Sequence, residues 1–127
     1  MHKRILIVDD DEQILDLLQL SLKVWCPDCY VVLATNGREA LKQIRRHQQP
    51  FHLIVTDYDM PMMNGLDLAQ TVRENWPDIR IVLMTGQLDR LNLHKEPNFV
   101  GFDGYIRKPF MMKQVKGIFL DDSEIFH

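Results

Sequence analysis

The chain has 127 residues, of which 15 are Lys or Arg and 18 are Asp or Glu, giving a formal net charge of −3. Hydrophobic residues make up 46% and charged residues 26%, proportions typical of a folded globular protein and not of a disordered one. The lack of a basic block argues against direct nucleic-acid binding, and the longest apolar runs fall far short of the roughly 18 residues that a membrane-spanning helix needs. We therefore expect one cytoplasmic domain over residues 1–127, without membrane insertion.

Two kinds of apolar segment alternate along the chain. Short aliphatic runs bounded by turn residues predict buried strands, and apolar residues spaced about 3.6 apart predict helices. In chain order the expected elements are a strand at 5–8, a helix at 14–25, a strand at 30–34, a helix after Asn36-Gly37, a strand at 53–55, a helix from Asn64-Gly65 to just before Pro77, a strand at 81–84, a weaker strand at 104–107 and a helix at 110–120. This order predicts an α/β fold, a doubly wound parallel sheet of five strands with helices on both faces.

Polar side chains follow four of the predicted strands. They are Asp9, Asp10, Asp11 and Glu12 after the first strand, Asp57 after the third, Thr85 after the fourth and Lys108 after the fifth. Because ligands of such sheets bind beyond the carboxyl ends of the strands, these residues are expected to meet at one site. An aspartate after a strand is also a common helix N-cap, and we expect that role for Asp11.

Clustered carboxylates either retain protons or bind a cation, and a set of oxygen ligands suits Mg²⁺. A carboxylate beside such an ion can attack phosphorus and form an acyl phosphate. The ammonium of Lys108 and the hydroxyl of Thr85 are then suited to stabilise the oxygens of the transferring group. The strand ends therefore predict phosphoryl transfer to Asp57.

Four motifs in this order resemble the receiver domains of response regulators, the CheY-like phosphoacceptor modules of two-component signalling. They are Ile5-Leu6-Ile7-Val8-Asp9-Asp10, Asp57-Tyr58-Asp59-Met60-Pro61-Met62-Met63-Asn64-Gly65, Leu83-Met84-Thr85-Gly86 and Gly104-Tyr105-Ile106-Arg107-Lys108-Pro109-Phe110. The resemblance covers about residues 4–120 and leaves an acidic tail at 121–127. It implies a flavodoxin-like fold with strand order 2-1-3-4-5.

The resemblance assigns roles to individual residues. Asp57 corresponds to the phosphoacceptor, Lys108 to the lysine that pairs with the phosphoryl group, and Thr85 to the switch hydroxyl. Tyr105 corresponds to the aromatic residue whose rotamer follows that hydroxyl. Such domains are not turnover enzymes, and they catalyse only their own phosphorylation and dephosphorylation.

The resemblance also implies a metal site and two structural features. The ligands of Mg²⁺ or Mn²⁺ would be Asp9, Asp10, Asp57 and the backbone carbonyl of Asp59. The Lys108-Pro109 bond is cis in the family, and Gly65 is expected to supply a backbone shape that other residues resist.

The implied phosphodonor is a sensor histidine kinase or a histidine phosphotransfer protein. An output domain or partner, or a second copy in a homodimer, would bind through the fourth helix, fifth strand and last helix. The chain departs from the family in residues 87–103, because Pro97 cannot lie inside a helix without losing a hydrogen bond. We therefore expect a short or irregular fourth helix.

Other functions stay open at this point. Asp57-Tyr58-Asp59 resembles the nucleophile motif of haloacid-dehalogenase-type phosphatases, although those enzymes carry it on the first strand. A flavodoxin would need a phosphate-binding loop where this chain has three aspartates. A pseudo-receiver, which is a binding module that is never phosphorylated, is the remaining alternative.

Two further patterns receive structural interpretations. Cys26-Pro27-Asp28-Cys29 follows a predicted helix, whereas thioredoxin-type pairs precede one, so we expect a turn with two reduced thiols. The methionines Met60, Met62 and Met63 are expected to pack beneath the loop that follows Asp57.

Overall fold

The computed structural model describes residues 3–86 and 102–120. Five parallel strands form one sheet in the order β2-β1-β3-β4-β5. The elements are β1 (Arg4–Val8), α1 (Glu12–Trp25), β2 (Tyr30–Ala34), α2 (Gly37–Arg46), β3 (Leu53–Asp57), α3 (Gly65–Asn75), β4 (Arg80–Thr85), β5 (Gly104–Arg107) and α5 (Met112–Leu120). The expected fold class and strand order are therefore confirmed. The expected irregular fourth helix and the acidic tail fall outside the described residues.

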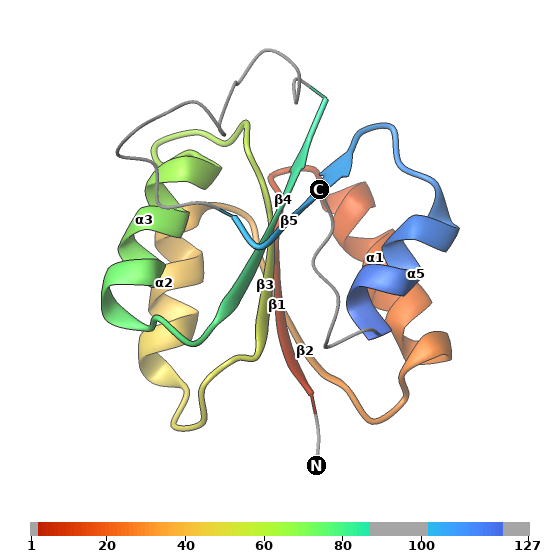
Figure 1. Cartoon of the computed structure of the whole chain (residues 1–127), viewed down its shortest axis with the longest axis horizontal. Helices are drawn as coiled ribbons and strands as arrows, with labels where there is room; N and C mark the ends of the chain where they lie inside the picture. The colour runs from red at the N-terminus through yellow and green to blue at the C-terminus, as the bar shows by residue number, and fades with distance from the viewer. Residues whose placement is uncertain (1–2, 87–101, 121–127) are drawn as a thin grey trace.

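Helices cover both faces of the sheet (Figure 1), with α1 and α5 on one face and α2 and α3 on the other. Alternate residues of each strand point to opposite faces, so the sheet contributes to two hydrophobic clusters. The α2/α3 core contains Leu6, Ile54 and Leu68, and the α1/α5 core contains Ile7, Val55 and Phe119. Within the described part of the chain, no helix is long and apolar enough to cross a membrane.

Three helices begin at capped positions close to the carboxyl edge of the sheet. The side chains of Asp11, Asn36 and Asn64 are the N-caps of α1, α2 and α3, and each accepts a hydrogen bond from a backbone N–H of the first turn. The cap predicted at Asp11 is thus confirmed. A side-chain cap satisfies a helix N–H that otherwise lacks a partner, and these caps fix where the three helices start.

Cys26 and Cys29 are joined by a disulfide, so the expectation of two reduced thiols is wrong for this structure. Cys26 is the C-cap of α1, and the N–H of Cys29 donates to its carbonyl oxygen over 3.0 Å. That turn folds the chain back and brings the two Cα atoms to 5.4 Å, a separation that a disulfide spans.

Candidate functional site

The candidate site lies where β1, β3, β4 and β5 end. Asp57 and Thr85 are the last residues of β3 and β4, while Asp9 and Lys108 come directly after β1 and β5. Because all strands are parallel, these ends share one edge of the sheet. Asp9 and Thr85 have no exposed surface, and Asp57 is 5% exposed. Asp9, Asp57 and Lys108 meet here as predicted, whereas Glu12 lies in the first turn of α1.

Lys108 holds two of the carboxylates together. Its Nζ lies 3.0 Å from Oδ2 of Asp9 and 3.1 Å from Oδ1 of Asp57, and both contacts are ion pairs. The other oxygen of Asp9 accepts the backbone N–H of Asp11 at 2.9 Å. These bonds fix both carboxyl groups, and the β1–α1 turn supplies one of the donors.

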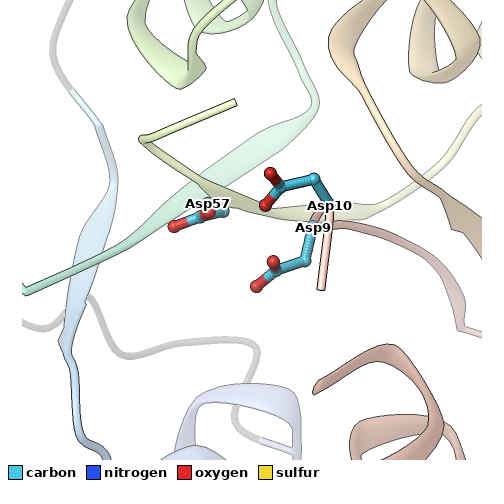
Figure 2. A group of neighbouring side chains, drawn as sticks. All are labelled: Asp9, Asp10 and Asp57. Carbon is cyan, nitrogen blue, oxygen red and sulfur yellow. The ribbon is translucent and has the colours of Figure 1, made fainter. Parts of the chain in front are cut away.

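The third carboxylate belongs to Asp10 and is exposed. Figure 2 shows it beside Asp9 and Asp57, where the chain leaves β1 and β3. One oxygen from each residue lies within 4.8 Å of the others, so the three can ligate one ion. Three carboxylates against the one ammonium of Lys108 leave two negative charges, which a divalent cation would balance. The donor set is the one that Mg²⁺ prefers.

Burial makes this cluster costly to ionise. The pKa of Asp57 is raised to about 6, chiefly by desolvation and then by the charge of Asp9, while Lys108 opposes both effects. Desolvation also raises the pKa of Asp9. Burial by itself would lower the pKa of Lys108, but its bonds to the two carboxylates outweigh this effect and raise it. Lys108 is therefore a permanent cation beside carboxylates that gain from any added positive charge.

Gly65 is needed because two backbone segments approach closely there, and not because its backbone has an unusual conformation. No glycine in residues 3–86 and 102–120 has a positive φ, which corrects the expected reason for this residue. A Cβ on Gly65 would lie 2.6 Å from the carbonyl oxygen of Asp57 and 3.0 Å from Cα of Tyr58. The start of α3 therefore packs directly against the backbone that carries Asp57.

The left-handed residue of this loop is Met62, with φ 70° and a side chain that is 70% exposed. Met60 is buried, and Met63 packs against the α2/α3 core. The packing prediction is right for Met60 and Met63 and wrong for Met62, which is exposed. Asp59 lies in the same loop and is exposed, and its carbonyl as a metal ligand stays a prediction.

Thr85 and Tyr105 lie on neighbouring strands. The register pairs Leu83 with Tyr105 and Thr85 with Arg107, so Thr85 and Tyr105 share one face of the sheet. Tyr105 is half-buried, its ring contacts Phe102 edge-on at 6.0 Å, and desolvation raises the pKa of its hydroxyl.

The Lys108-Pro109 peptide bond is cis, as expected, and the N–H of Lys108 donates to the carbonyl of Thr85 at 2.9 Å.

One supporting residue was not anticipated from the sequence. Thr56 is fully buried in β3, and its hydroxyl donates to the carbonyl oxygen of Asp57 at 3.0 Å. A hydroxyl in an otherwise apolar strand, directly before the candidate nucleophile, is the signal that would have indicated it.

Comparisons with known proteins agree with this geometry. The sequence profile of the response regulator receiver domain matches residues 5–119. The alkaline phosphatase synthesis transcriptional regulatory protein PhoP of Bacillus subtilis is 33% identical over 117 residues, which are 91% of this chain and 46% of that protein. The two-component response regulator ARR12 of Arabidopsis thaliana is 32% identical over 122 residues, covering 91% of this chain and 19% of that protein.

A solved structure shares the fold as well. The CheY-like response regulator receiver domain protein of Methanospirillum hungatei JF-1 superposes with a TM-score of 0.77 at 28% identity, covering 94% of this chain and 91% of that one. The chain spans about half the length, or less, of the curated relatives described above. Its profile match, its fold and its strand-end residues together show that the chain belongs to the family of response regulator receiver domains.

Proposed function

We propose that this chain is the phosphoacceptor of a two-component phosphorelay and that Asp57 receives the phosphoryl group. The observation that carries the proposal is the ion-paired position of Asp57. This carboxylate ends a buried strand and is held by Lys108. It also lies close enough to the carboxylates of Asp9 and Asp10 for all three to ligate one metal ion. A helix cap or a structural ion pair would not require a third carboxylate at the same point.

In the proposed reaction the donor is a phosphohistidine of a sensor kinase or phosphotransfer protein. A carboxylate oxygen of Asp57 bonds to phosphorus, the phosphorus–nitrogen bond breaks, and the imidazole leaves with the electron pair. Lys108 orients Asp57 beforehand and lies next to the charge that arrives. Asp9, Asp10, Asp57 and the carbonyl of Asp59 would hold Mg²⁺ or Mn²⁺, which when bound neutralises charge on the phosphoryl oxygens.

Thr85 and Tyr105 are the proposed switch. Both lie on the same sheet face next to the site, so a hydroxyl that turns toward a phosphoryl group would leave space for the neighbouring ring. The response would reach a partner through β5, α5 and the segment between β4 and β5. Some relatives are named as DNA-binding regulators, and this chain would act in the cytoplasm through a comparable output module.

The test is phosphorylation by a small donor such as acetyl phosphate with Mg²⁺, followed by intact mass. We expect one hydroxylamine-sensitive phosphate on the wild type and none on Asp57→Asn. Asp11→Asn is the matched control, because asparagine caps a helix as well as aspartate does and the residue lies outside the ion-paired cluster. Equal labelling of Asp57→Asn and wild type would overturn the proposal.

The same preparation separates the other candidates. Sustained turnover of a phosphomonoester would indicate a phosphatase. No phosphate on the wild type, together with an unchanged tryptophan fluorescence spectrum, would indicate a pseudo-receiver.

A further inference from the structure

Cys26 and Cys29 lie at the junction of α1 and β2, at the edge of the sheet opposite the acidic site. Hydrogen bonds on both sides of the pair hold this junction. The N–H of Cys26 donates to Leu22 at 2.8 Å, and the N–H of Tyr30 donates to Lys3 at 2.8 Å. The pair therefore connects the C-cap of α1 to the residue directly before the edge strand β2.

The disulfide can be reached from solvent. Both cysteines are partly buried against the α1/α5 core, and neither is closed off. Cys29 lines a groove of about 770 Å³ beside Arg4 and Tyr30, while both cysteines line a second groove of about 270 Å³ beside Lys23. A small oxidant or a dithiol reductant therefore has access to the sulfur atoms.

The position of the pair argues against a catalytic dithiol. Catalytic pairs lie at helix N-termini, where the partial positive charge stabilises a thiolate. Cys26 instead caps the C-terminus of α1, so no helix N-terminus activates it. Peroxide and disulfides both react through the thiolate, so a pair without such activation suits a slow, stoichiometric modification of this chain better than repeated oxidation of other proteins.

We propose that Cys26 and Cys29 form a reversible oxidation site whose oxidant is hydrogen peroxide and whose reductant is a dithiol. Peroxide converts one thiol to a sulfenic acid and releases water, and the second thiol attacks that sulfur and releases another water. Two thiols and one peroxide thus give one disulfide and two waters. A dithiol returns two electrons and two protons and leaves as its own disulfide.

The bond closes a short loop, since the cysteines are separated by three positions in the sequence. Loop-closure entropy then predicts an unfolding constant roughly twentyfold lower in the oxidised protein than in the reduced protein. Oxidation would thereby fasten the end of α1 to the start of β2 without involving the phosphoacceptor site.

The first measurement counts thiols. Protein reduced with dithiothreitol, freed of reductant and trapped with a maleimide is expected to gain two labels by intact mass. After hydrogen peroxide it should gain none, remain monomeric on a non-reducing gel, and regain both labels after dithiothreitol. Two labels after peroxide, covalent dimers, or failure of dithiothreitol to restore the thiols would each overturn the proposal.

The second measurement compares urea unfolding of the two redox states. The double variant Cys26→Ser/Cys29→Ser is the control, because peroxide also reaches the exposed methionines Met62 and Met111. Only the wild type should change in stability with redox state. Asp57→Asn should show the same thiol counts as wild type, so the redox proposal and the phosphoacceptor proposal can fail independently.

Discussion

Replacing Asp57 with asparagine should stabilise the metal-free protein at neutral pH. The pKa of Asp57 is about 6 in the folded chain against 3.8 for an unperturbed aspartate, chiefly because the carboxyl group is desolvated. The folded state therefore holds its proton more tightly than the unfolded state does. This difference lowers stability as pH rises from about 4 to about 6, and above that range the loss is complete.

The size of the effect follows from the shift. About two pKa units at 1.36 kcal/mol each correspond to roughly 3 kcal/mol. The introduced asparagine would carry no charge, and its amide oxygen can still accept from Lys108, so Asp57→Asn should regain that amount at pH 7.5. Near pH 4 the gain should fall below about 1 kcal/mol, because the carboxyl group is then largely protonated in the folded protein.

Urea unfolding in a metal chelator at pH 7.5 and pH 4 measures both values. Asp11→Asn removes an exposed carboxylate of the same β1–α1 turn, and its stability should change by less than about 1 kcal/mol at either pH. If Asp57→Asn were no more stable than wild type at pH 7.5, the buried-carboxylate account of this site would be wrong.

Three other outcomes follow from the same structure. In thermal melts, saturating Mg²⁺ should raise the Tm of the wild type and reduce the Tm difference between the wild type and Asp57→Asn. An unchanged Tm of the wild type would argue against a metal site. Gly65→Ala should lose about 1–3 kcal/mol in urea unfolding, since its Cβ would lie 2.6 Å from backbone oxygen, whereas Gly86→Ala, with 3.7 Å, should be near neutral. Asp103→Ala should cost about 2 kcal/mol in the same assay, because the N–H of Ile81 loses its carboxylate acceptor; equal stability would show that solvent replaces it.

The sequence was sufficient to place the main site residues because parallel strands have a simple geometry. Once five strands run in one direction, whatever follows them shares one edge. The strand ends alone were enough to predict the edge of the sheet at which Asp9, Asp57, Thr85 and Lys108 lie. The predicted ends of β3 and β4 were short by one or two residues, since Thr56, Asp57 and Thr85 are polar and resembled turn residues. They belong to the strands, so the rigid sheet positions them.

Features that depend on distances between segments were harder to predict. Gly65 was identified correctly, but its reason is the approach of α3 to the backbone of Asp57, which no local pattern reveals. Met62 has a positive φ and is exposed while Met60 is buried, and the sequence of three similar methionines does not indicate this difference. The disulfide depends on how the turn after Cys26 folds, and two cysteines three positions apart are compatible with either redox state.

The charges at this site explain why its residues act as a set. The single positive charge of Lys108 balances one carboxylate, and Asp9 and Asp57 share it. Asp10 adds a further negative charge on the solvent side of the pair. Burial stops water from screening the charges of Asp9 and Asp57, which is why these two carboxyl groups bind protons more tightly than usual. A proton at low pH, or a divalent cation at neutral pH, relieves the same repulsion. Asp57→Asn should therefore stabilise the protein most at pH 7.5 without metal. Its stabilising effect should be smaller at pH 4 without metal, and also smaller at pH 7.5 with Mg²⁺.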